Sequence, residues 1–119
     1  SPYITVYDFV LSGCSDGKLS CSIDRLQRVT PNQFMISLTD YLDKNGEVAG
    51  LESLKKTGIV KLANFTTNAV IYSGASRSNQ PVDFYLIQSP KGVIGVEFQQ
   101  PQSFDLNLKT EFLNRITIN

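Results

Sequence analysis

The residues of this chain that could do chemistry are few, because its 119 residues include no histidine. Without histidine, a serine or cysteine nucleophile lacks its usual general base. Ser53 and Lys56 have the spacing of a serine and lysine pair, but we expect them to lie on the solvated face of a short helix. Asp83 and Glu97 fall on two strands predicted to pair, where we expect an exposed polar pair rather than the two carboxylates of a glycosidase. The sequence therefore predicts a protein that is not an enzyme, with no catalytic residue.

One segment, from Tyr41 to Glu52, partly matches the twelve-residue loop that binds calcium in helix-loop-helix proteins. Tyr41 stands where the first carboxylate ligand belongs. Asp40, one position earlier, would point about 100° away from that direction on a helix. We therefore expect this segment to join two helices, and we predict neither a metal nor another cofactor.

The two cysteines, Cys14 and Cys21, enclose the hexapeptide SDGKLS. A turn over residues 16–19 would place them opposite each other on adjacent strands, at a separation that suits a disulfide. The alternative is a pair of reduced, partly buried thiols. Two cysteines with this spacing and no histidine do not make a zinc site.

A polar loop over residues 74–81, GASRSNQP, is the strongest candidate for a binding site. Its hydroxyl, amide and guanidinium donors suit contact with a carboxylate, a phosphate or the backbone of a partner. The glycine spacing and the following helix of a phosphate-binding loop are missing. The alternative is a solvated loop without a ligand. The candidate residues are Ser73, Gly74, Ser76, Arg77, Ser78 and Asn79.

The charges balance, because eleven basic residues face eleven acidic ones and the formal net charge is zero. A neutral protein is not drawn to polyanions by a long-range field, so nucleic acid is an unfavoured partner. A local basic face with exposed aromatic side chains would still allow a nucleic-acid-binding domain, which is the alternative function. The alternative to that face is two solvated surface clusters. The basic residues concerned are Arg25, Arg28, Lys55, Lys56 and Lys61.

The clearest structural signal in the sequence is a helix between Thr30 and Gly46. Thr30 and Gln33 have the spacing of a capping box, and Gly46 supplies a left-handed stop. Between them Phe34, Leu38 and Tyr41 recur at helical spacing, which predicts an apolar face over residues 31–43.

The rest of the chain is predicted to be mostly strand. An opening hairpin, a short second helix over residues 48–57, and a series of antiparallel strands follow from alternation, turn residues and glycine or proline breaks. Both helices are expected to pack on one face of the sheet. The predicted strands are 3–11, 18–24, 59–65, 69–73, 82–88, 93–99, 104–109 and 115–119.

These elements predict a single α+β domain over residues 1–119, with an antiparallel or mixed sheet, one main helix and a short second helix. The opening order of two strands and a helix is that of the β-grasp arrangement, over the first half of the chain only. No family motif accompanies it.

We therefore expect a non-enzymatic protein interaction or assembly module, which acts through sheet edges such as residues 3–11 and 115–119 and through polar loops. The partner is expected to be another protein or a second copy of the chain. The longest apolar runs, such as residues 84–87, fall far short of the ~20 residues that span a bilayer, so membrane insertion is not predicted. A surface rich in hydroxyls and amides slightly favours a secreted, surface or virion-associated protein over a cytoplasmic one.

Overall fold

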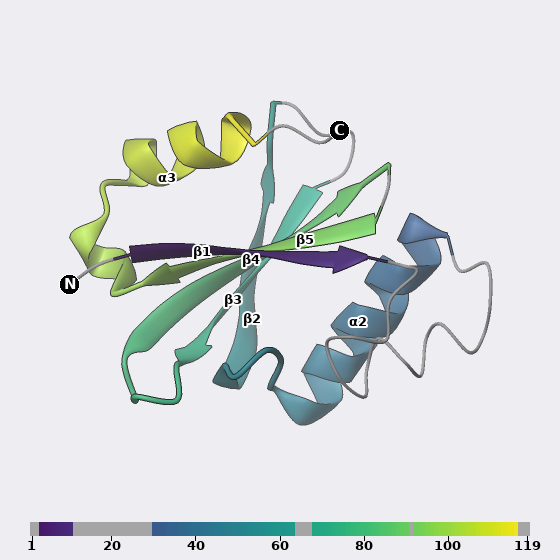
Figure 1. The fold of residues 1–119 in the computed structure, drawn as a ribbon, viewed down its shortest axis with the longest axis horizontal. Helices are drawn as coiled ribbons and strands as arrows, with labels where there is room; N and C mark the ends of the chain where they lie inside the picture. The colour runs from purple at the N-terminus through teal and green to yellow at the C-terminus, as the bar shows by residue number, and fades with distance from the viewer. Residues whose placement is uncertain (1–2, 11–29, 64–67, 91, 117–119) are drawn as a thin grey trace.

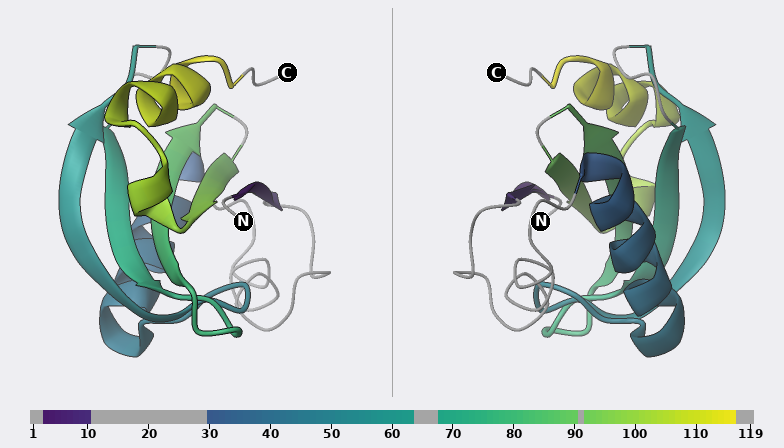
Figure 2. Two further views of the ribbon diagram at one scale, coloured as in Figure 1. Left: turned by 90° about the vertical axis from the view of Figure 1, so that its left-hand side faces the viewer. Right: turned by 90° about the vertical axis from the view of Figure 1, so that its right-hand side faces the viewer.

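A five-stranded antiparallel sheet forms the centre of the computed structural model, with a helix on each of its two faces (Figures 1 and 2). The structure describes residues 3–10, 30–63, 68–90 and 92–116. The α+β class predicted from the sequence is thereby confirmed.

The order of the strands in the sheet is β1-β5-β4-β3-β2. Four strands that follow one another in the chain pair as neighbours, and β1 pairs with the last of them, β5. The predicted hairpin around Pro90 is confirmed as β4 and β5, paired from Val82 with Gln99 to Ser89 with Gly92. The strands are β1 (Tyr3–Val10), β2 (Glu52–Lys61), β3 (Asn68–Ala75), β4 (Pro81–Ser89) and β5 (Gly92–Gln99).

The predicted main helix is present as α2 (Pro31–Asn45), and its caps are those expected from the sequence. The Gln33 backbone N–H donates to the Thr30 hydroxyl, and the Thr30 N–H donates to the Gln33 side-chain oxygen, each at 3.1 Å. Gly46 ends the helix in a left-handed conformation, with φ of 68°. Phe34 and Leu38 are fully buried, whereas Tyr41 is only partly buried.

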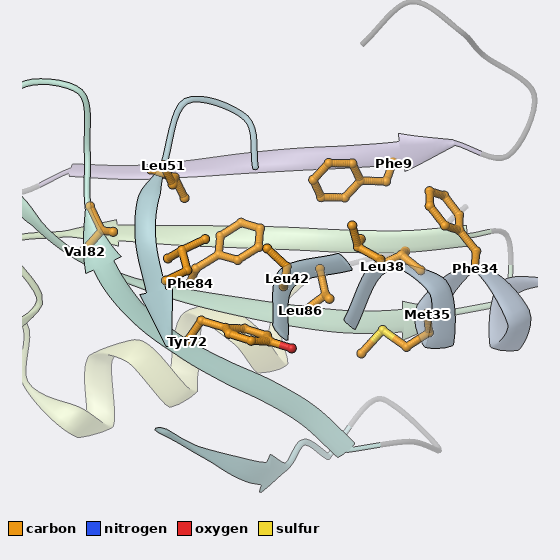
Figure 3. Close-up of a cluster of buried hydrophobic side chains, with 12 residues drawn as sticks. Phe9, Phe34, Met35, Leu38, Leu42, Leu51, Tyr72, Val82, Phe84 and Leu86 are labelled. Atoms are coloured by element: carbon orange, nitrogen blue, oxygen red, sulfur yellow. The ribbon is translucent and has the colours of Figure 1, made fainter. Parts of the chain in front are cut away.

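The first hydrophobic core lies between α2 and one face of the sheet (Figure 3). Side chains from all five strands or their connections meet the apolar face of the helix here. Its buried members are Phe9, Phe34, Met35, Leu38, Leu42, Leu51, Leu54, Tyr72, Val82, Phe84, Leu86 and Val93.

The second core lies on the opposite face, under α3 (Leu106–Asn114) and the short 3-10 helix η1 (Pro101–Ser103) that precedes it (Figure 2). Because strands β4 and β5 are covered from both sides, every residue of β5 is buried. The buried members of this core are Leu62, Ala69, Tyr85, Ile87, Ile94, Val96, Phe98 and Leu113.

The predicted second helix over residues 48–57 is wrong. Val48 and Leu51 instead form a backbone bridge around a tight turn, and β2 begins at Glu52. Ala49 and Gly50 in this turn have φ values of 51° and 83°, which a helix cannot contain. Leu51 and Leu54, whose spacing suggested a helix, are buried in the first core from a turn and a strand.

The predicted strand over residues 104–109 is also wrong, because α3 occupies most of it. The Asp105 carboxylate accepts a 2.8 Å hydrogen bond from the Asn107 N–H and so caps the helix. Arg115 caps the other end, and neither it nor Ile116 is in a strand, so the predicted edge strand over residues 115–119 is not formed at these two positions. The two helices of the described chain lie on opposite faces of the sheet, not on one face as expected.

Several predictions fall outside the described residues. These are the strand over residues 18–24, the state of Cys14 and Cys21, and the positions of Arg25 and Arg28. The β-grasp-like opening is not confirmed, because it depends on the strand over residues 18–24.

Candidate interaction surface

Strand β1 forms one edge of the described sheet. It pairs with β5 over all eight of its residues, in a register without interruption from Tyr3 opposite Gln99 to Val10 opposite Gly92. Val6 is 50% exposed and Asp8 is exposed, so the face of β1 toward α3 is only thinly covered. Among the strands that the structure describes, none pairs with the other side of β1.

The opposite edge, β2, is built differently. Its register against β3 shifts twice, between Glu52 and Lys55 and between Lys56 and Gly58. Irregular pairing and exposed lysines are features that protect a sheet edge from pairing with another chain. The two edges of this sheet are therefore unequal, and β1 is the regular one.

The basic residues within the described ranges, Lys55, Lys56 and Lys61, are all exposed along β2. Lys61 lies five residues beyond Lys56, which separates them by roughly 16 Å along a strand. That separation is about twice the ~8 Å over which charges act in physiological salt. Most aromatic rings of the sheet are buried in the two cores, where they cannot stack on bases; these are Phe9, Tyr72, Phe84, Tyr85 and Phe98.

The predicted binding loop is shorter than expected, because β3 continues to Ala75. Ser73 is a strand residue whose hydroxyl donates a 2.7 Å hydrogen bond to Asp83. Gly74 is also in β3, and a Cβ there would lie 2.5 Å from the carbonyl oxygen of Glu52. These two residues serve the packing of the sheet.

The remaining loop, residues 76–80, closes on itself. The Ser76 N–H donates to the carbonyl of Gln80, and the Asn79 N–H donates to the carbonyl of Ser76, each at 2.9 Å. The hydroxyls of Ser76 and Ser78 lie 2.9 Å apart. This compact turn holds the backbone on either side of Arg77, whose side chain is exposed.

A hollow of about 630 Å³ lies between this loop, the turn at residues 49–51 and the first half of β1. Ser76, Arg77 and Ser78 line it from the loop, and Thr5 and Tyr7 line it from β1. Glu97 of β5 also lines the hollow. Three of the six predicted loop residues are therefore brought together around one concave surface.

Glu97 is an almost fully buried acid, with 4% of its surface exposed. Its Oε1 atom accepts a 2.6 Å hydrogen bond from the hydroxyl of Tyr7. A buried carboxylate is tolerated only when it is hydrogen-bonded or paired. Tyr7 is thus the hydrogen-bond donor that satisfies one carboxylate oxygen of Glu97 beside the hollow.

Arg77 also lines a smaller hollow of about 300 Å³, together with Tyr41, Glu47 and Glu52. Its Nε atom lies 3.3 Å from the position that a Cβ on Gly50 would take, so the guanidinium group rests against the 49–51 turn. Within the described parts of the chain, Arg77 forms no ion pair.

The predicted pairing of Asp83 and Glu97 is wrong, because the two side chains lie on opposite faces of the sheet. Asp83 is bound by Ser73 and forms a 3.5 Å ion pair with Lys109 of α3, whereas Glu97 contacts Tyr7 on the α2 face. They lie on opposite faces because Phe84, not Asp83, pairs with Glu97. Ser53 and Lys56 lie on β2 and not on a helix.

The described residues contain no cluster of three or more metal-ligating side chains. None of their helices combines the length and the apolar character needed to cross a membrane. Compared with protein families, with curated proteins and with solved structures, the chain matches none of them.

The sequence predicted residues 3–11 as a sheet edge, but it did not predict that Thr5, Tyr7 and Glu97 line a hollow beside the polar loop. Tyr7 and Glu97 are ninety residues apart in the chain, and no local pattern connects them. The one signal available was an acidic residue in an otherwise apolar strand, GVIGVEFQ.

Proposed function

We propose that this chain is a non-enzymatic interaction module that accepts an extended segment of another protein, or of a second copy, along the edge of β1. The observation that carries this proposal is the uninterrupted register of β1 as an edge strand, beside a second edge that carries bulges and lysines. An edge strand offers a row of backbone N–H and C=O groups to an added strand.

Charge supports the same function. The formal net charge of the chain is zero, so two copies do not repel each other through their overall fields. Asp8 is the only charged residue of β1. A partner strand with few acidic residues would therefore meet little electrostatic opposition at this edge.

Hydrogen exchange tests whether the edge is open. In an antiparallel pair, alternate amides of an edge strand point away from its neighbour. In dilute protein, we expect every second amide of β1 to exchange quickly and its neighbours slowly. Protection of all β1 amides in the dilute monomer would mean that another segment of the chain already occupies the edge, and would overturn the proposal.

A pair of charge substitutions tests whether the edge binds. Val6→Lys places a charge on the β1 edge, and Ile59→Lys is the matched control on β2, because these side chains are 50% and 56% exposed. We expect concentration-dependent self-association of the wild-type chain, measured by sedimentation velocity. Val6→Lys should abolish it and Ile59→Lys should leave it unchanged. A monomeric wild-type chain, or equal association of both variants, would contradict the β1 edge as the self-association site.

A further inference from the structure

We propose that the 630 Å³ hollow binds a small zwitterion, whose ammonium group lies on Glu97 and whose carboxylate lies on Arg77. This site is independent of strand addition at β1, because its ligand contacts side chains and not the backbone edge. The ligand class is a primary amine and a carboxylate joined by a short spacer.

The ammonium half of the site is the carboxylate of Glu97. It can accept about four hydrogen bonds, and among the described residues its side chain accepts one, from Tyr7. The residue lines the hollow and is only 4% exposed, so bulk water poorly serves its remaining acceptor capacity. An ammonium group, with three donors and a positive charge, is the complementary partner.

The carboxylate half is Arg77 with the hydroxyls beside it. The guanidinium group carries five donors in a planar fork that matches a carboxylate, and it forms no ion pair among the described residues. Ser76 and Ser78 line the same hollow, and because one of their hydroxyls donates to the other, the pair adds one further donor. Gly50 supports this arrangement, since any larger residue would press on the Arg77 side chain.

The two charges together select the ligand. Glu97 and Arg77 line one hollow, yet they are not within ion-pair distance of each other. A simple cation would lie in the field of Arg77, and a simple anion would lie in that of Glu97. A molecule with both charges satisfies both groups, and a volume of about 630 Å³ falls within the roughly 300–1,000 Å³ of small-molecule pockets.

A ladder of ω-amino acids tests the proposal on the full chain. Glycine, β-alanine, 4-aminobutyrate and 6-aminohexanoate separate the two charges by increasing lengths, and ethylamine and acetate each carry one charge. In calorimetric titrations we expect one spacer length to bind best and the two single-charge compounds to bind at least about tenfold more weakly. Equal binding of ethylamine would make this a plain cation site, and absence of binding by every amino acid would equally overturn the proposal.

Two variants assign the charges, with Arg115→Gln as a surface control outside the hollow. Glu97→Gln keeps the shape of the side chain and an acceptor for Tyr7, and should remove the advantage of the best amino acid over acetate. Arg77→Gln should remove its advantage over ethylamine. If either variant, shown by circular dichroism to be folded, retains both preferences, the assignment is wrong. Val6→Lys should lose self-association and still bind the best amino acid. A failure of the proposed β1 edge and a failure of the proposed hollow are therefore seen in different measurements.

Discussion

The hydroxyl of Tyr7 in β1 donates a 2.6 Å hydrogen bond to the carboxylate of Glu97 in β5, so the edge strand is held through side chains as well as backbone. The two residues are diagonal neighbours, because Tyr7 pairs with Gly95 and Thr5 pairs with Glu97. The missing side chain at Gly95 leaves room for the rings of Phe9 and Phe84, which pack around Tyr7 at centroid distances of 6.2 and 6.0 Å.

Tyr7→Phe should lower the free energy of unfolding by about 1.5 to 3 kcal/mol, because it removes a hydrogen bond to a buried charge and keeps the ring. Denaturant unfolding at neutral pH measures this change. In the double variant with Glu97→Gln, the loss should shrink, since a neutral amide is less costly to leave unpaired. Equal losses in both backgrounds would show that the loss does not come from the hydrogen bond between Tyr7 and the Glu97 carboxylate.

Tyr72→Phe, unlike Tyr7→Phe, should leave the free energy of unfolding at neutral pH unchanged or raise it by about 1 kcal/mol. The Tyr72 hydroxyl is buried and has no hydrogen-bond partner among the residues that the structure describes, and removing an unsatisfied polar group removes its desolvation cost. Denaturant unfolding of this variant beside Tyr7→Phe compares two tyrosines of the same core. A loss above 1 kcal/mol would contradict the unpaired state of the hydroxyl.

Alkaline pH should destabilise the protein through Tyr72. Burial, and then the charges of Asp43 and Asp40, raise the pKa of Tyr72 from 10.0 to about 12. The folded state holds the Tyr72 proton more tightly than the unfolded chain does. The free energy of unfolding that depends on this proton is therefore fully present below pH 10 and is lost as the pH rises toward 12. The free energy of unfolding of wild type should fall faster than that of Tyr72→Phe between these values. If the free energies of unfolding of the two proteins fell in parallel with pH, the alkaline loss of stability would not come from Tyr72.

Gly95→Ala should destabilise the fold by about 1 to 3 kcal/mol, which is typical of overpacking. A Cβ at Gly95 would lie 2.5 Å from the ring of Phe84 and 2.9 Å from that of Phe9, and both rings are buried. Gly58→Ala is the matched control in β2, where a Cβ meets nothing within 4 Å. That variant should be neutral or slightly stabilising. Equal unfolding midpoints in denaturant would argue against tight packing at Gly95.

Thr30→Ala should cost about 1 kcal/mol, since it removes the side-chain half of the capping box of α2. Thr39→Ala in the same helix is the control. The Thr39 hydroxyl donates to carbonyls of the preceding turn at 2.9 and 3.0 Å, an arrangement that slightly disfavours helix. We expect this control to be neutral or stabilising by thermal unfolding, and a larger loss at Thr39 than at Thr30 would invalidate the assignment of the cap.

The parts of the fold that could be predicted are those encoded within a few residues. The caps of α2 are specified by Thr30, Gln33 and Gly46 alone, and all three act as predicted. The hairpin of β4 and β5 is likewise set by its turn residues and by the runs of aromatic and branched aliphatic residues on either side. Each of these elements forms from contacts that are close in sequence.

The failures occurred where the local pattern was ambiguous. Phe104, Leu106 and Leu108 alternate like a strand, but Leu108 is 57% exposed in α3, and the helix buries Leu113 instead. The signal that could have corrected this prediction was Asp105, a good N-cap residue directly before the segment. The turn at Ala49 and Gly50 was missed because Ala49 gives no warning of a positive φ.

The candidate site could be predicted only in part, because its residues come from segments that are far apart in the sequence. Ser76, Arg77 and Ser78 belong to one polar loop and were visible in the sequence. Their partners in the hollow, Tyr7 and Glu97, come together through the pairing of β1 with β5, which only the three-dimensional sheet creates.

The strand order has a consequence for the timing of folding. Strands β2 to β5 can pair one after another with short connections, whereas β1 must close a very long loop to reach β5. Since a ribosome makes β1 first and β5 last among the strands, β1 leaves it well before its partner exists. We therefore expect β1 to be the segment that a chaperone must shield during synthesis, and the last strand to dock in refolding.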